Sequence, residues 1–340
     1  MKKPHFSKFL NFALTSLMAG ITLLSAIFLA QQPIHASQNV NEHTLKAPYV
    51  VYGSGVSSEI YPKLNDIFQV NNNFKKITVD ANDYRQYINP NATGTTNAAM
   101  ISSVAIAPSD PGSGVRVNIK DYNGQNNILK VTSQQYAMVA QMAGVTDINI
   151  IVTANTPVSG ESALTGVYKA LAADGATIDT ENTKAANEMI RATQPAIAAN
   201  KDDKTYPGKL MAAIGEVSKQ VAEQKQKTDQ LATKQDIQRM LEQALQKQGI
   251  ANQTAPQHIT VIVNALITFE NSPIASSKSY IKNVSNTINN VINSTGNLMT
   301  QAKDWLNSTD FKDATQAASK TAQSWIAKII QWFKELLNLN

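Results

Sequence analysis

The chain has 340 residues, of which 43% are hydrophobic and 16% are charged, and none is cysteine. This length is sufficient for two domains that each bury a core. The lack of cysteine excludes a disulfide scaffold, a thiolate metal site and a cysteine nucleophile. The formal charge of +5 and the isoelectric point near 9.1 suggest nucleic-acid binding, a hypothesis that depends on where the charges lie.

The N-terminus has the pattern of an export signal. Lys2, Lys3 and Lys8 precede an uncharged and mainly apolar run over residues 9–30, and Ala36 ends a small-residue cleavage site. We therefore predict a signal peptide over residues 1–36, with retention as an uncleaved membrane anchor as the alternative. Both outcomes place the rest of the chain outside the cytoplasm, either secreted or held at the cell surface.

The charge that remains after the signal peptide is small. Removal of residues 1–36 takes away three lysines and no acid, which lowers the formal charge to +2. The remaining lysines and arginines form no cluster of the kind that phosphate binding requires. We therefore expect no nucleic-acid partner.

Residues 37–48 are polar and unpatterned, which indicates a flexible lead-in, and residues 49–200 are expected to form an α+β domain. Runs rich in β-branched and aromatic residues alternate there with segments of helical periodicity. We expect strands over 49–52, 76–79, 101–107, 115–119 and 147–154, and helices over 60–68, 83–88, 133–143, 163–171 and 180–199. From Lys76 onward the order is β-α-β-β-α-β, the order of a ferredoxin-like sandwich.

Several short motifs of this region combine in a recognisable order. They are Ile101–Val104, Gly112–Val115, Thr132–Tyr136, Ala143–Val145, Val158–Gly160 and Ala163–Ala170. In combination they resemble the YpuA-like family, whose members are exported proteins of Gram-positive bacteria built on a domain of unknown function. The resemblance covers about residues 49–220. It implies export and a shared architecture, but no established reaction, ligand or catalytic residue.

The C-terminal half has helical periodicity, and we expect a helical domain over residues 205–310. Residues 208–248 form either one long helix or a hairpin broken near 232–236, where Thr233 or Asp236 would begin the second arm. Residues 257–269 are apolar nearly all round, which predicts a buried helix, with a strand as the alternative because many are β-branched.

A heptad spacing of apolar residues runs from Ile281 to Trp305. The seam is typical either of an antiparallel bundle within the chain or of a coiled coil between chains, so an oligomer is one of two alternatives.

Residues 311–340 are predicted to form a C-terminal amphipathic helix. Its broad apolar face includes Trp325, Ile329, Trp332, Phe333 and Leu336, and lysines lie beside it. This composition suits contact with a membrane surface or with a partner. The alternative is docking on the protein's own core.

One segment resembles a catalytic motif. We single out a turn or surface motif made of Ser159, Gly160, Glu161, Ser162 and Thr165. It follows the predicted strand 147–154 and begins a helix, as a nucleophile elbow does, but Leu164 replaces the last glycine of G-x-S-x-G. His258 is the histidine that would have to serve Ser162 as a base. We expect Ser159 or Ser162 to act as a helix cap instead.

We assign no catalytic residue, no metal ligand and no cofactor from the sequence, since histidines are few and carboxylates are scattered. The sequence favours an exported, non-enzymatic binding or structural module that contacts a cell-envelope component or a protein partner. The alternative is an extracellular hydrolase that acts on a cell-wall or other envelope substrate.

Overall fold

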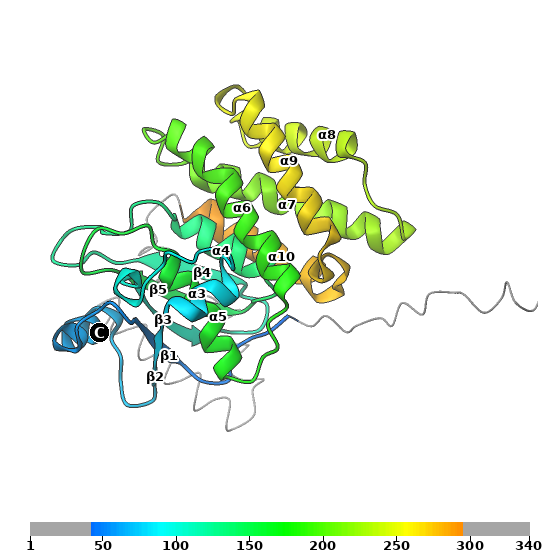
Figure 1. Ribbon diagram of the computed structural model, residues 1–340. Coiled ribbons are helices and arrows are strands. Elements are labelled where there is room, and N and C mark those ends of the chain that lie inside the picture. The colour runs from blue at the N-terminus through cyan, green and yellow to red at the C-terminus, as the bar shows by residue number, and fades with distance from the viewer. Residues whose placement is uncertain (1–41, 295–340) are drawn as a thin grey trace, which may run out of the picture. The chain divides into compact units, whose positions relative to one another are not determined.

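The computed structural model describes residues 42–294, and its centre is a mixed five-stranded sheet (Figure 1). The strands are β1 (Tyr49–Gly53), β2 (Lys75–Val79), β3 (Ser103–Pro108), β4 (Val115–Ile119) and β5 (Ile148–Thr153). Their order across the sheet is β2-β1-β3-β5-β4. The predicted α+β class is therefore confirmed, and each predicted strand is present.

The pairing differs from a ferredoxin-like sandwich. β1 and β2 are parallel neighbours, β4 and β5 are parallel neighbours, and β3 is antiparallel to both β1 and β5. In a ferredoxin-like sheet the two strands that flank a helix are separated by a third strand. The ferredoxin-like hypothesis is wrong for this sheet, because β4 and β5, which flank the helix Ser133–Met142, are direct neighbours, and β1 lies between β2 and β3.

Helices cover both faces of this sheet. The helices of this half are α2 (Tyr61–Phe68), α3 (Ala81–Tyr87), α4 (Ser133–Met142) and α5 (Glu161–Ala173), of which α3 packs on α5. On one face, Leu64 and Phe68 of α2 pack with Val50 and Tyr52 of β1. On the other face, α5 packs on β1, β2 and β3, and α4 packs on β4. Gly166 permits the close approach of α5, because a Cβ there would lie 2.9 Å from a methyl carbon of Val104.

The second half of the described chain is helical. It comprises α6 (Thr180–Ala199), α7 (Tyr206–Thr228), α8 (Lys234–Lys247), α9 (Pro256–Asn271) and α10 (Lys278–Asn293). α6 packs on α4 and α9, α7 packs on α8 and α10, and α10 also contacts α4 and β4 (Figure 1). The hairpin alternative for residues 208–248 is confirmed, since Thr233 caps α8 together with Asp236.

The helical predictions need one correction. Residues 256–271 form a helix, as expected, but α9 is not buried all round, because Val261 is 49% exposed. Within the predicted heptad seam, Val284, Ile288 and Val291 of α10 are buried, and α10 packs on α7 of the same chain. The rest of the seam and the predicted helix over 311–340 lie outside the described residues.

The sheet and the helical half share one core. A single cluster of buried side chains extends from Val51 and Val104 in the sheet to Leu210 in α7 and Val284 in α10. Gly215 of α7 lies at a close contact in this core, since a Cβ there would be 2.6 Å from both Ile288 and Met138. The boundary predicted between a domain over 49–200 and one over 205–310 stays a prediction.

Candidate functional site

The candidate site lies at the edge of the sheet where β1 and β2 end. Because these strands are parallel, Ser54 and Asp80, which follow them, emerge at the same edge. The antiparallel β3 begins there, and Ser103 Oγ accepts a hydrogen bond of 3.1 Å from the Gly53 N–H. In open α/β sheets, ligands commonly bind outside the carboxyl ends of the strands. We therefore take this edge of the sheet as the candidate binding site.

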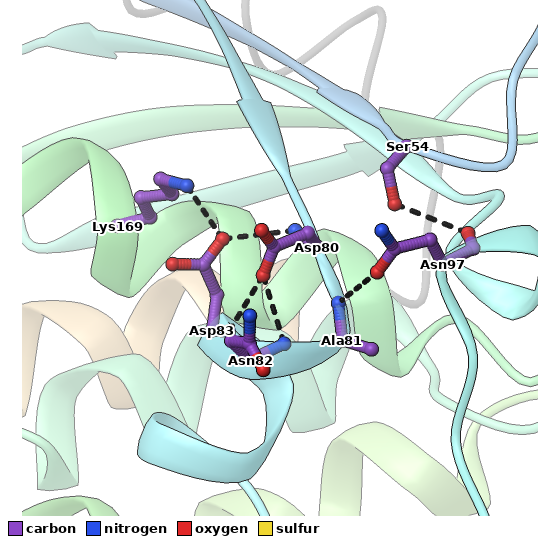
Figure 2. Close-up of polar contacts among 7 residues, drawn as sticks. All are labelled: Ser54, Asp80, Ala81, Asn82, Asp83, Asn97 and Lys169. Atoms are coloured by element: carbon purple, nitrogen blue, oxygen red, sulfur yellow. Dashed lines mark hydrogen bonds and ion pairs between the residues drawn. The ribbon is translucent and has the colours of Figure 1, made fainter.

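Asp80 and Asp83 organise the start of α3. Asp80 Oδ1 accepts hydrogen bonds from the backbone N–H groups of Asn82 (2.8 Å) and Asp83 (3.0 Å), and Asp83 Oδ2 accepts one from the Asp80 N–H (2.8 Å). These backbone donors lower the pKa of Asp80. Lys169 of α5 reaches Asp83 Oδ2 at 2.5 Å, as Figure 2 shows, and this contact ties α3 to α5.

Four polar side chains form what we call the edge surface, namely Ser54, Asn82, Arg85 and Asn97. Ser54 Oγ donates to the Asn97 carbonyl (3.1 Å), and Asn97 Oδ1 accepts from the Ala81 N–H (3.0 Å) (Figure 2). Arg85 Nη2 donates to Asn82 Oδ1 (2.6 Å), and Arg85 Nη1 donates to the Thr95 carbonyl (3.1 Å). The surface is therefore held in a fixed geometry while Asn82 and Asn97 remain exposed.

The predicted turn motif begins α5 at the same edge. Gly160 is the N-cap residue and has a φ of 106°, in the left-handed region. Tyr136 donates a hydrogen bond of 2.5 Å from its hydroxyl to the Gly160 carbonyl, and a Cβ at Gly160 would lie 2.5 Å from that hydroxyl oxygen. The predicted cap at Ser159 or Ser162 is wrong, because the N-cap position is occupied by glycine, which has no side chain to form the cap bond.

Ser162 is engaged inside the protein. It is 7% exposed, its hydroxyl donates to the Ser102 carbonyl at 2.9 Å, and its Oγ lies 2.5 Å from Ser102 Oγ. Ser102 Oγ in turn accepts from the Ala163 N–H at 2.9 Å. A hydroxyl that donates to a carbonyl is not donating to a base, which is what a serine nucleophile requires.

His258 and Ser162 lie on elements with different neighbours. His258 is on α9, which packs on α6, α7 and α8, whereas α5 packs on the sheet and on α3. His258 Nδ1 is buried and has no hydrogen-bond partner among residues 42–294. The described contacts bring no histidine to the hydroxyl of Ser162.

The remaining motif residues also have local roles. Glu161 Oε2 accepts from the Tyr84 hydroxyl at 2.9 Å, Thr165 Oγ1 donates to the Glu161 carbonyl at 3.0 Å, and Ser159 Oγ lies 3.5 Å from the Glu161 N–H. Burial, together with the nearby Glu161 carboxylate, raises the pKa of Tyr84 well above its ordinary value. Tyr84 is therefore protonated at neutral pH and donates to Glu161.

Neither a metal centre nor a membrane-spanning helix is found in the part of the chain that the structure describes. No three histidine, aspartate or glutamate side chains gather as metal ligands within residues 42–294. None of the helices between these positions combines the length and apolar character that crossing a bilayer requires. The residues predicted for membrane or partner contact, Trp325, Ile329, Trp332, Phe333 and Leu336, lie outside the described residues.

The edge surface was not predicted as a unit, although one part of it had a signal. Asp80 followed by Asp83, next to Asn82 of this surface, is the spacing of a capping box, which the sequence shows directly. Lys169 lies 86 residues from Asp83, and Asn97 lies 43 residues from Ser54, so no local pattern joins them.

Comparison with known proteins identifies the family. The family model described as "Protein of unknown function (DUF1002)" matches residues 52–287, which is more than half of the chain, and the chain belongs to this family. The chain is also similar to "Uncharacterized protein YpuA" of Bacillus subtilis (strain 168), with 33% identity over 124 residues. That match covers 36% of this chain and 40% of the relative. No solved structure matches the chain. The family and its relative carry no assigned activity, and the YpuA-like resemblance of the sequence is confirmed.

Proposed function

We propose that the protein is an exported, non-catalytic module that binds a component of the cell envelope through the edge surface. The observation that carries this proposal is the position of Ser54, Asn82, Arg85 and Asn97 at the carboxyl ends of β1 and β2. Their mutual hydrogen bonds hold exposed amides and a guanidinium in place, which lowers the entropic cost of binding a polar partner.

Export is supported by the sequence. The order of Lys2, Lys3 and Lys8, the apolar run over 9–30 and the small residue Ala36 is typical of a signal peptide. An exported protein of a cell surface meets wall glycans and anionic wall polymers, which offer hydroxyl, amide and phosphate groups. Asparagine side chains and a guanidinium are suitable partners for such groups.

The hydrolase alternative has less support. It requires a nucleophile with a base, and Ser162 donates its hydroxyl proton to the Ser102 carbonyl in a buried position. A carboxylate mechanism would require two carboxyl groups that face a substrate. Asp80 and Asp83 instead accept hydrogen bonds from backbone groups or from Lys169.

The test is co-sedimentation of the full chain with purified cell-wall sacculi. We expect the protein to pellet with the sacculi and Arg85→Ala to weaken binding by about tenfold, the effect of losing one charged hydrogen bond. Arg239→Ala is the matched control, since Arg239 also bonds an acceptor three residues earlier on its own helix, Asp236 at 2.5 Å. Equal loss of binding in both variants, or no binding by the wild type, would contradict the proposal.

A further inference from the structure

A second polar cluster lies around Glu42, at the start of the described chain. The carboxyl group of Glu42 accepts a hydrogen bond from Gln141 Nε2 of α4 and one of 2.6 Å from Asn283 Nδ2 of α10. Gln141 Oε1 accepts from the Thr287 hydroxyl at 2.5 Å, and Thr287 Oγ1 accepts from the Val115 N–H at 3.0 Å. One chain of hydrogen bonds therefore links Glu42 to α4, α10 and β4.

Glu42 belongs to a segment that is fastened along the protein, which we call the N-terminal strap (residues 42–46). The His43 N–H donates to the Gly144 carbonyl at 2.7 Å, and the Thr146 N–H donates to the His43 carbonyl at 3.0 Å. Leu45 of the strap is only 3% exposed. The strap is thus docked by backbone hydrogen bonds, by one apolar side chain and by the Glu42 carboxyl.

Among the described residues, the groups that act on the Glu42 carboxyl include no positive charge. The groups that act on its carboxyl are Gln141 from α4, Ser279, Tyr280 and Asn283 from α10, and Asp147 from the turn before β5. None of these is a cation, and Asp147 is an acid. Burial raises the pKa of Glu42 to about 7, and Asp147 adds to the rise against the hydrogen bonds of Asn283 and Gln141.

We propose that Glu42 is a pH-sensitive latch, which holds the N-terminal strap against α4 and α10 in acid and weakens this attachment as the pH rises to neutrality. In the docked strap the carboxyl is partly buried and, in acid, protonated, so docking moves no charge out of water. At higher pH the docked carboxyl becomes a partly buried anion beside Asp147, whereas in a released strap it would be fully solvated.

The sign and size of the effect follow from proton linkage. A released Glu42 would titrate near its ordinary pKa of 4.5, and the docked group titrates near 7. Between these values the docked state holds a proton that the released state has lost, so the docking equilibrium falls about tenfold for each pH unit. Above pH 7 the dependence levels off, because both states are ionised.

In the sequence the latch directly follows residues 1–41, which contain the predicted export signal. It does not depend on the proposed binding function, since Glu42 is not part of the edge surface.

Hydrogen exchange of the full chain tests the latch, with the amides of His43 and Thr146 as reporters of strap docking. Exchange is measured at pH 5, 6, 7 and 8 and corrected for the intrinsic pH dependence of each amide. We expect protection at both amides to fall about 40-fold from pH 5 to pH 7. The Val131 amide, which donates to the Ser159 carbonyl at 3.1 Å, is the internal reference and should not follow this fall.

Two variants complete the test. Glu42→Gln cannot ionise, and its protection at His43 and Thr146 should not change with pH. Glu59→Gln, which alters an exposed acid in another segment, should keep the wild-type dependence. Constant wild-type protection, or an unchanged fall in Glu42→Gln, would overturn the proposal. If the strap of Glu42→Gln is undocked at every pH, the fall of wild-type protection at His43 and Thr146, relative to protection at Val131, still tests the proposal.

Discussion

At the scale of single residues, Gly160 has the most constrained position at the start of α5. Its φ of 106° strains any residue with a Cβ, and that Cβ would meet the Tyr136 hydroxyl at 2.5 Å and Ile128 at 2.8 Å. We expect Gly160→Ala to lower the free energy of unfolding by about 3 kcal/mol through backbone strain and displacement of Tyr136. Urea unfolding followed by circular dichroism measures this change.

Gly124→Ala separates the effect of backbone strain from the effect of displacing Tyr136. Gly124 also has a positive φ, of 77°, but a Cβ there would meet nothing within 4 Å. We expect this variant to lose only about 1 kcal/mol, the cost of the left-handed backbone alone. Equal losses in the two variants would show that the contact with Tyr136 contributes nothing.

Residues with local roles were predictable, and residues with distant partners were not. Asp80, Thr132 and Asp179 cap helices, a role that their residue types and positions indicate because a cap bonds backbone groups two or three residues away. The cap of α5 was missed, since Gly160 takes a left-handed conformation that the sequence does not specify. Glu42 was missed because its partners Gln141 and Asn283 are 99 and 241 residues away.

At the scale of elements, the capping box of α3 supports a prediction with a pH dependence. Asp80→Ala removes the acceptor for two backbone N–H groups, and we expect a loss of about 1 kcal/mol at pH 7. The pKa of Asp80 is lowered in the folded protein, so its stabilisation is complete above its ordinary pKa of 3.8. It is lost as the pH falls through the lower folded value.

Unfolding of the wild type and Asp80→Ala in urea at pH 7 and pH 2 tests this dependence. The difference in stability between the two proteins should shrink at pH 2. Asp66→Ala, at an exposed position of α2, should cost little at either pH. A difference between wild type and Asp80→Ala that is as large at pH 2 as at pH 7 would contradict the capping role.

The order of the elements was predictable, but the pairing of the strands was not. Periodicity reveals that a strand exists and which of its faces is more deeply buried, as in β4, where the buried Val115 and Val117 alternate with the partly buried Arg116. All six residues of β5 are buried, and its run of apolar residues fits an inner strand without specifying its neighbours. The ferredoxin-like hypothesis failed for this reason.

At the scale of the whole molecule, packing between helices that are far apart in sequence determines which of the predicted alternatives the chain adopts. The apolar spacing of α10 fits a partner in its own chain as well as one in another chain, and contacts with α7 and α4 bury it in its own chain. The edge surface likewise depends on the parallel pairing of β1 and β2, which brings Ser54 and Asp80 together. Membership in a family of unknown function indicates an architecture that the family members share, but it does not identify a reaction.

The central claim is that the protein binds the cell envelope without cleaving it. The most direct test incubates the full chain with purified sacculi and follows bound protein and soluble wall fragments in the same sample over time. We expect binding to saturate and no fragments to be released, with Ser162→Ala binding as the wild type does. Release of fragments by the wild type, lost in Ser162→Ala, would contradict the claim.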